Sequence, residues 1–175
     1  MAIHEVYIGI GSNIGNRLIN LQGAIDLLNE LDKTSVNEVS AIYMTEPIGE
    51  AEQRRFYNGV ILLETSLSPE ELRRQCKTIE QKLGRPANYP RWSPRAIDLD
   101  ILLYDDLCLN TETLSIPHPE LEQRKFVLVP LLDIANPLHP KTGKTIRQHL
   151  GCSKDQSVLI KTKEHIRIKK RRNAF

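Results

Sequence analysis

The residues with the clearest chemical potential lie between Arg91 and Asp100. Asp98 and Asp100 fall two residues apart on an expected strand, so both carboxylates point to the same face. Two neighbouring anions on an apolar strand repel each other unless a cation lies between them. Carboxylate oxygens select hard cations, and Mg²⁺ commonly binds through one or two carboxylates together with substrate phosphates. The pair therefore indicates either a magnesium site or, more simply, a solvated acidic strand end.

Three arginines flank this pair in the preceding loop: Arg85, Arg91 and Arg95. Guanidinium groups bind phosphate oxygens through paired hydrogen bonds. Arginines beside two carboxylates suit a polyphosphate held with a metal ion, and the simpler alternative is a salt bridge to the aspartates. Trp92, the only tryptophan, stands in the same proline-containing loop, where it either covers a flat ligand or belongs to the core.

Other side chains could complete such a site. Ser115 and His118 are able to donate to phosphate, although a lone histidine is more often structural. Asn58 could bind the edge of a heterocycle with its amide, or form a local hydrogen bond. Phe56 and Phe126 are core residues by default, and the alternative is an aromatic sandwich around a ligand.

Two glycine motifs resemble nucleotide-binding turns, and both fail. Gly9, Gly11 and Gly15 follow an expected strand, but the third glycine of a dinucleotide motif would come one residue earlier. Gly143–Thr145 resembles the end of a P-loop, but Leu138 occupies the position that needs the first glycine. Gly11 would still let a ligand approach the backbone closely.

The elements that would position these residues alternate strand and helix. We expect strands over 6–10, 36–44, 56–65 and 97–104, a return strand over 107–109, helices to about 31, over 69–83, in parts of 120–134 and near 145–150, and long loops over 45–55 and 85–95. The core order β-α-β-β-α-β predicts an α+β fold with a ferredoxin-like βαββαβ core, a mostly antiparallel sheet, flanking helices and long active-site loops.

The second expected helix has explicit boundary signals. Ser68 can cap its N-terminus, Pro69 fits the first helical position and Glu71 completes a capping box. Gly84 can end it. By contrast, Pro130 should interrupt the helix expected near residue 130.

Composition limits the class of protein. The chain has 175 residues with 40% hydrophobic and 26% charged residues, which fits one globular domain and excludes collagen and coiled coil. No apolar run approaches the ~20 residues of a membrane span, and the N-terminus lacks the pattern of a secretory signal. Cys76, Cys108 and Cys152 match neither a disulfide framework nor a zinc spacing, so we expect a cytoplasmic setting.

The net charge of +2 is unevenly distributed, because residues 161–175 carry seven Lys or Arg and one acid. We therefore expect a catalytic domain over residues 1–152 and a basic C-terminal extension over residues 153–175. The extension is expected to be solvated or disordered, or to form a last strand over 166–168, and contact with nucleic acid is the less favoured alternative.

Several segments together resemble one family, that of 6-hydroxymethyl-7,8-dihydropterin pyrophosphokinase. The match is clearest in Arg91–Asp100, a highly specific block, and spans roughly residues 3–150 in order. The other segments that carry the resemblance are Gly9–Asn13, Tyr43–Gly49, Phe56–Asn58, Ser115–His118 and Arg124–Leu128.

The resemblance implies transfer of pyrophosphate from ATP to 6-hydroxymethyl-7,8-dihydropterin, with release of AMP, in tetrahydrofolate biosynthesis. It implies ATP as co-substrate, two Mg²⁺ ions, no nucleic-acid or membrane partner, and a monomer. Metal binding falls to Asp98 and Asp100, and catalysis to these two with Arg85 and Arg95. It implies ATP binding by Glu80, Arg85, Arg91, Arg95, Ile101, Ser115, His118 and Arg124. It implies pterin binding by Gly11, Thr45, Glu46, Ile48, Phe56, Asn58, Trp92, Asp98 and Phe126.

The chain departs from the better-known family pattern at four positions. Ala87 stands where some members carry a loop arginine, Thr113 and Pro119 replace an arginine and a tyrosine, and Phe56 replaces a tyrosine. These changes bear on nucleotide affinity and leave the expected reaction unchanged.

Two other functions are weighed against this one. A ferredoxin-like module could bind RNA through its basic tail, but such sheets need exposed aromatic residues for stacking, and the chain is only 5% aromatic. A different Mg²⁺-nucleotide transferase on the same fold is the second alternative.

Overall fold

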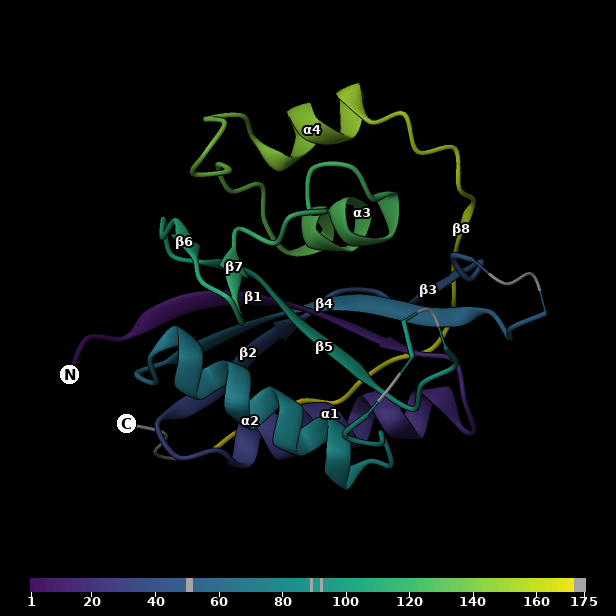
Figure 1. The fold of residues 1–175 in the computed structure, drawn as a ribbon, viewed down its shortest axis with the longest axis horizontal. Coiled ribbons are helices and arrows are strands. Elements are labelled where there is room, and N and C mark those ends of the chain that lie inside the picture. The colour runs from purple at the N-terminus through teal and green to yellow at the C-terminus, as the bar shows by residue number, and fades with distance from the viewer. Residues whose placement is uncertain (50–51, 89, 92, 172–175) are drawn as a thin grey trace.

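The computed structural model describes residues 1–49, 52–88, 90–91 and 93–171. Within these residues the fold is α+β with three layers: α1 and α2 cover one face of the main sheet, and α3 and α4 lie on the other side (Figure 1). No helix of the described part is long and apolar enough to cross a membrane. In chain order the elements are β1 His4–Ser12, α1 Arg17–Glu30, β2 Thr34–Val39, β3 Tyr43–Thr45, β4 Phe56–Thr65, α2 Pro69–Lys82, β5 Asp98–Tyr104, β6 Leu109–Asn110, β7 Ser115–Ile116, α3 Lys125–Ile134, α4 Ile146–Cys152 and β8 Leu159–Lys161.

The main sheet runs in the order β5-β1-β4-β3-β8, and β2 also pairs with β4. Every pairing among the described strands is antiparallel, which confirms the expected mostly antiparallel sheet. The two central strands, β1 and β4, carry continuous apolar runs because both of their faces are covered by helices.

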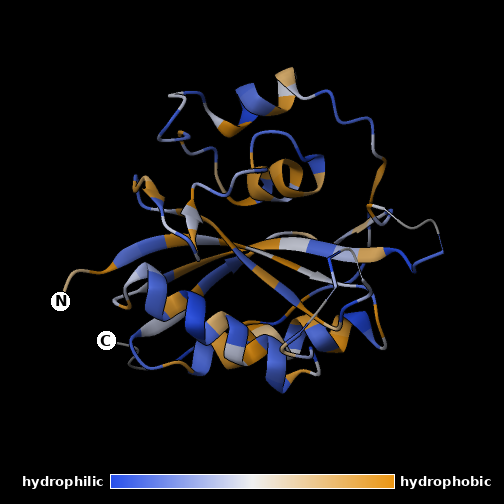
Figure 2. Ribbon diagram, in the orientation of Figure 1, coloured by the Kyte–Doolittle hydropathy of each residue, from blue (hydrophilic) through white to orange (hydrophobic). Residues whose placement is uncertain are grey.

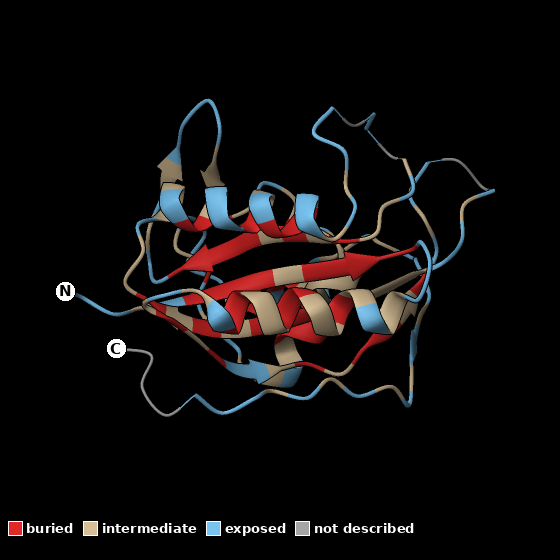
Figure 3. Ribbon diagram, turned by 90° about the horizontal axis from the view of Figure 1, so that it is seen from below, coloured by how far each residue is buried: buried red, intermediate tan, exposed pale blue. Residues whose placement is uncertain are grey.

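Alternate residues of the central strands supply two cores. Ile8 and Leu63 are fully buried against the α1 and α2 layer, whereas Tyr7, Leu102 and Leu128 belong to the core beneath α3 and α4. Figure 2 shows α3 as mostly hydrophobic, as expected for a helix between the sheet and α4. Figure 3, seen from the side of α1 and α2, shows buried strands behind two helices that keep an exposed outer face.

Helix α2 has the predicted boundaries. Ser68 Oγ accepts the Glu71 N–H at 3.4 Å, Glu71 Oε2 accepts the Ser68 N–H at 2.8 Å, and Pro69 is the first helical residue. Gly84 follows the helix with φ +99°, a backbone conformation that favours glycine. The capping box thus fixes the residue at which α2 begins. It therefore also fixes the position along the helix of the buried Glu80, near the other end.

Three predicted elements differ in the structure. The strand expected over 36–44 is divided into β2 and β3, because Ser40 bonds to Val60 through both its N–H and its Oγ, each at 2.9 Å. The return strand begins at Leu109 and pairs with β7, not with β5. The helix expected in parts of 120–134 begins at Lys125 and continues through Pro130.

The described part of the C-terminal segment is largely exposed but is bound along the fold, and its strand is β8, not residues 166–168. After pairing with β3, the segment passes along α1, where Arg167 exchanges two hydrogen bonds with Gln22 at 2.8 and 2.9 Å. Arg171 Nη1 donates to the carbonyls of Asn29 and Leu31 at the end of α1. These contacts join residues far apart in sequence, so no local pattern revealed them.

Replacing Ser68 with alanine should lower the free energy of unfolding by about 1 kcal/mol, since both bonds of the capping box are lost. Urea unfolding of S68A and wild type measures the difference. Ser66→Ala serves as a control because Ser66 bonds to Lys33 O through its backbone N–H, and equal unfolding free energies for S68A and wild type would contradict the capping role.

Candidate active site

Asp98 and Asp100 project from one face of β5, as their spacing predicts. Leu99 and Ile101, which alternate with them, are 2% and 5% exposed and pack on the opposite side against the α1 and α2 core. On the neighbouring strand β1, Asp98 is paired with Gly11 and Asp100 with Gly9. Because glycine has no side chain, the Asn58 and Leu102 side chains can approach β1 closely at these two positions.

The two carboxylates have different surroundings. Asp98 is bound on both oxygens, with Oδ1 2.7 Å from Arg85 Nη1 and Oδ2 3.1 Å from Arg95 Nη1. Among the described residues no hydrogen bond to the Asp100 carboxylate is found. Burial, and then the charge of Asp98, raise the pKa of Asp100 to about 7. Asp100 is therefore the acid whose charge still lacks compensation.

A divalent cation would compensate these two acids better than any neighbouring side chain of the protein. No group of three or more His, Cys, Asp or Glu side chains gathers around them in the described ranges, so a bound Mg²⁺ would complete its octahedron with phosphate oxygens and water. A dedicated protein cage would be expected for a structural metal, and a pair of acids is typical of a metal that arrives with a nucleotide.

Glu80 links α2 to the site from below β5. Its carboxylate is 2% exposed; Oε1 accepts the Leu99 N–H at 2.9 Å and lies 3.0 Å from Arg85, and Oε2 lies 3.0 Å from Lys77. The resemblance placed Glu80 along the nucleotide. In the structure the Glu80 carboxylate binds other residues of the protein, and its contact with Arg85 holds Arg85 beside Asp98.

A cavity with an aromatic residue at each of two walls lies in front of the acids, and we call it the aromatic slot. Most of the residues expected to bind the pterin line it, together with both acids and two arginines: Thr45, Glu46, Ile48, Phe56, Asn58, Arg95, Asp98, Asp100, Arg124 and Phe126. Phe56 enters from β4 and Phe126 from the start of α3, and both line this one cavity.

Asn58 is held in one orientation at the inner end of the slot. It is 8% exposed, and its Nδ2 donates to Thr45 Oγ1 at 2.6 Å. A Cβ placed on Gly11 would lie 2.6 Å from Asn58 Oδ1, too close for any real contact. Gly11 thus serves the slot by leaving room for Asn58, and the Asn58 carbonyl oxygen is turned toward β1.

A second cavity, which we call the α2-side cavity, begins at Asp100 and runs between α2 and the β6–β7 hairpin. Ile101, Ser115 and His118 line it, as expected for nucleotide contacts. Arg73 and Lys77 line it as well, and the sequence interpretation did not single them out. Their spacing of four residues on one helix face could have revealed them.

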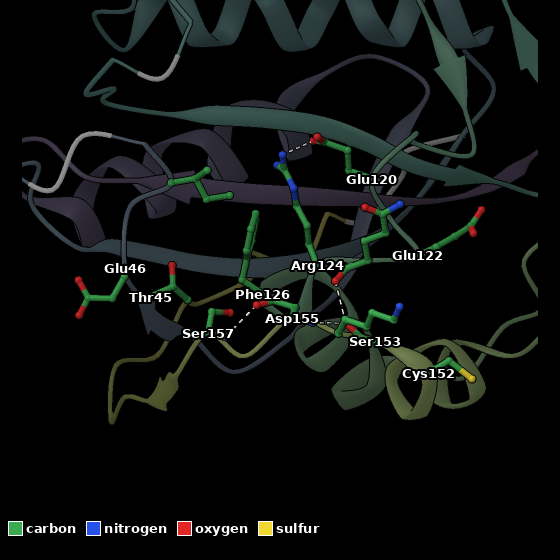
Figure 4. A pocket seen from close by; sticks show the side chains of 13 residues that line it. Thr45, Glu46, Glu120, Glu122, Arg124, Phe126, Cys152, Ser153, Asp155 and Ser157 are labelled. Carbon is green, nitrogen blue, oxygen red and sulfur yellow. Dashed lines mark hydrogen bonds and ion pairs between the residues drawn. The ribbon is translucent and has the colours of Figure 1, made fainter.

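His118 is oriented to donate into this region. Its Nδ1 accepts the Glu120 N–H at 3.2 Å, which leaves the ring proton on Nε2. Burial lowers the pKa of His118, with opposing effects of Glu120 and Arg124, so the ring is neutral near pH 7. Nearby, Arg124 is paired with Glu120 (Figure 4) and lies with its guanidinium carbon 5.5 Å from the Phe126 ring centre.

Some predicted residues stand at the margin of this site. Ile48 is 42% exposed, and Glu46 pairs with Arg55 at 2.7 Å on the surface, although both line the slot. Arg91 is exposed on its loop, and Trp92 lies outside the described residues.

Asn13 is a site residue that the sequence interpretation missed. It is 2% exposed, and its backbone N–H and side-chain Oδ1 bond to Arg95 O and Arg95 N at 3.0 and 2.7 Å. Its Nδ2 donates to Gln53 Oε1 and to Arg54 O. One buried amide therefore joins both expected active-site loops. Two signals were available: its position in the glycine-rich turn after the first strand, and its place in Gly9–Asn13, a segment that carries the family resemblance.

Comparisons with known proteins agree with this geometry. Residues 7–136 match the sequence profile of a family described as 7,8-dihydro-6-hydroxymethylpterin-pyrophosphokinase (HPPK). The chain is 38% identical over 150 residues to a 2-amino-4-hydroxy-6-hydroxymethyldihydropteridine pyrophosphokinase of Pseudomonas aeruginosa, covering 86% of this chain and 92% of that one. A Bacillus subtilis protein of the same name is 44% identical over 128 residues, with 73% and 76% covered.

Longer proteins share the same region. The chain is 40% identical over 155 residues to the folic acid synthesis protein fol1 of Schizosaccharomyces pombe, and spans 21% of that protein. A crystal structure of Plasmodium falciparum HPPK-DHPS with pterin and p-hydroxybenzoate superposes with a TM-score of 0.66 at 17% identity, covering 87% of this chain and 42% of that one. At this identity the likeness shows a shared fold.

Without divalent cations, Asp100→Asn should stabilise the protein at pH 8. The pKa of Asp100 is raised from its usual value to about 7, so ionisation opposes folding, and this contribution to stability is lost as pH rises from about 4 to 7. We expect D100N to gain about 2 kcal/mol at pH 8 and much less at pH 4.

Urea unfolding in EDTA at both pH values measures this gain. Asp98→Asn is the matched control: it should lower stability, because Asp98 carries two arginine contacts. A D100N protein that is no more stable than wild type at pH 8 would contradict the uncompensated charge.

Proposed function

The chain belongs to the 7,8-dihydro-6-hydroxymethylpterin-pyrophosphokinase family, and from this membership we propose that it transfers pyrophosphate from ATP to 6-hydroxymethyl-7,8-dihydropterin. The products are AMP and the pterin diphosphate, a step of folate biosynthesis. The observation that carries the assignment of sites is that Asp100 borders both the aromatic slot and the α2-side cavity. Two substrates that occupy these cavities meet at the acids.

We assign the pterin to the aromatic slot. A flat bicyclic ring can stack between Phe56 and Phe126, with its amide edge toward Asn58 and Thr45, whose mutual bond fixes their orientation. The hydroxymethyl group then points toward Asp98 and Asp100, which line the same cavity. We propose the remaining slot residues, Glu46 and Ile48, as backbone contacts and Trp92 as a cover.

ATP is assigned to the α2-side cavity, with the triphosphate extending toward the acids. Ser115 and His118 line that cavity, and Ile101 forms part of its wall. The neutral His118 ring can donate its Nε2 proton to a phosphate oxygen. Arg85, Arg91, Arg95 and Arg124 are proposed to contact the phosphates, and Glu80 to hold Arg85 in place.

The metal site is proposed at Asp98 and Asp100, with two Mg²⁺ ions bound when ATP is present. When bound, the ions supply positive charge that neutralises the triphosphate. The hydroxyl oxygen of the pterin attacks the β-phosphorus and gives up its proton to water, the bond between the β-phosphorus and the bridging oxygen of the α-phosphate breaks, and AMP leaves with that oxygen. Arg85 and Arg95 can follow the developing negative charge by exchanging part of their contact with Asp98 for phosphate contact.

Positioning is proposed to dominate catalysis, without a covalent enzyme intermediate. We also propose that the βαββαβ order, with β2 and β3 as one interrupted strand, makes the core ferredoxin-like.

Residues 1–152 contain every proposed site residue, and residues 153–175 remain the proposed basic extension. Cys76, Cys108 and Cys152 are free, which supports a reducing, cytoplasmic setting, and the protein is proposed to act as a monomer.

Incubation with ATP, Mg²⁺ and 6-hydroxymethyl-7,8-dihydropterin should release AMP, and omission of the pterin should abolish the release. Asp98→Ala should lower kcat by about 10³-fold or more, because both metal binding and the placement of Arg85 and Arg95 depend on it. Asp32→Ala, at an exposed acid beyond α1, is the control. ADP as the product, or AMP release without the pterin, would exclude the proposed reaction.

Gly11→Ala should raise the KM for the pterin by about tenfold or more, because the new methyl group displaces the Asn58 side chain. The KM for ATP should stay within about twofold. Gly151→Ala is a suitable control, since nothing lies within 4 Å of a Cβ at that position. Steady-state kinetics with each substrate varied in turn measures both constants, and an unchanged pterin KM in G11A would remove Asn58 from the pterin site.

A further inference from the structure

We propose that the segment directly after α4, residues 153–157, holds the Phe126 wall of the aromatic slot in position, and that Asp155 is the positioning residue. This inference rests on the proposed function for the identity of the substrate in the slot. It concerns a part of the chain that lies beyond residues 7–136, which match the family.

Asp155 caps a helix that is distant in sequence. Its Oδ2 accepts the N–H of Lys125, the first residue of α3, at 2.9 Å. The first N–H groups of a helix have no acceptor within the helix, and no side-chain bond comes from Arg124 at the N-cap position. A carboxylate at this end also interacts favourably with the helix dipole. Lys125 stands between Arg124 and Phe126, both of which line the slot.

The cap is itself held rigidly. Asp155 Oδ1 accepts the Ser157 N–H at 2.8 Å, and the Asp155 N–H donates to Ser153 Oγ at 3.2 Å. Ser153 Oγ donates in turn to the carbonyl of Gln123 at 2.8 Å. The segment therefore grips the backbone at Gln123 and at Lys125, on both sides of Arg124.

Burial alone would raise the pKa of Asp155, but the hydrogen bonds from Ser157 and Lys125 outweigh it and lower the pKa. The carboxylate that caps α3 is therefore charged at neutral pH, when its attraction to the helix N-terminus is greatest.

The Phe126 ring needs such support because it has open space on a second side. A cavity of about 670 Å³ adjoins the slot, and Phe126 lines both (Figure 4). The slot side of this cavity includes Thr45 and Ile48, and the segment side is formed by Ser153, Asp155 and Ser157. The Arg124 guanidinium lies over this ring, but a ring that borders two cavities has fewer packing neighbours than a core residue. Its position follows from the backbone that carries it.

The continuation of the same segment supports the opposite wall. Strand β8 pairs with β3, with Leu159 opposite Thr45, and Thr45 Oγ1 is the acceptor for Asn58. Residues 153–161 therefore support both the aromatic wall and the polar end of the slot. None of them lines the aromatic slot or the α2-side cavity, both of which contain Asp100.

The test separates substrate positioning from general stability. Asp155→Ala should raise the KM for 6-hydroxymethyl-7,8-dihydropterin about tenfold and leave the kcat at saturation within about twofold. The KM for ATP should rise by less, because Arg124, beside the cap, is only one of several proposed phosphate contacts. Asp155→Asn keeps one oxygen acceptor for the Lys125 N–H and should recover most of the pterin affinity. Asp32→Ala, which removes an exposed carboxylate away from the slot, should match wild type.

Amide hydrogen exchange in the free protein supplies a readout that does not depend on the substrate. The Lys125 and Phe126 amides should exchange about tenfold faster in D155A than in wild type, with no change in β5. Unchanged exchange there, or an unchanged pterin KM, would overturn the positioning role. So would an equal loss in pterin KM, ATP KM and kcat, since that pattern indicates a purely structural acid.

The two proposals fail in different ways. Wild-type protein that releases no AMP with the pterin would overturn the proposed function, whereas faster exchange at Lys125 and Phe126 in D155A would still support the helix clamp. Active wild type with a D155A variant of normal pterin KM would overturn the clamp alone.

Discussion

The repulsion between Asp98 and Asp100 is the constraint around which this molecule is organised. Two carboxylates on one face of a largely buried strand are unfavourable unless positive charge compensates them. The protein supplies that charge to Asp98 through Arg85 and Arg95 and withholds it from Asp100. Because arginine side chains compensate the charge of only one of the two acids, the site suits a cation that enters with a triphosphate. The cost to the free protein is the raised pKa of Asp100.

The sheet makes this arrangement possible. Its central strand β1 presents Gly9 and Gly11 opposite the two acids, and the same Gly11 stands opposite Asn58 on β4. A row of small and polar positions therefore crosses an otherwise apolar sheet at one end. The backbone gives rigidity there, and the missing Cβ atoms leave room for the Asn58 and Leu102 side chains. Around this row the loops are tied together by one buried amide, Asn13, and the aromatic wall is tied to the C-terminal segment by Asp155.

Local patterns predicted the elements well wherever one short-range interaction decided the outcome. The capping box at Ser68 and the period-two placement of Asp98 and Asp100 are of this kind, because each involves residues two or three apart. The predictions were wrong where a distant partner decided: Ser40 divides a strand through bonds to Val60, and residues 153–171 follow β3 and α1. Most slot residues came from the family resemblance, and the meeting of Phe56 with Phe126 required the fold.

The residues and their order in the chain already indicate the chemistry that is available: two acids on one strand face, arginines in the loop before them, and a glycine that lets a ligand approach the backbone. Those are properties of residue type and short spacing, which the backbone geometry of strands and turns translates directly into direction. The folded arrangement was needed to show which acid is paired with arginines, that Asn13 joins two loops, and that Asp155 caps α3. Each of these depends on how the chain packs. The arginines on Asp98 come from 13 and 3 positions away, whereas the contacts of Asn13 and Asp155 join residues 30 or more positions apart and leave no period in the sequence.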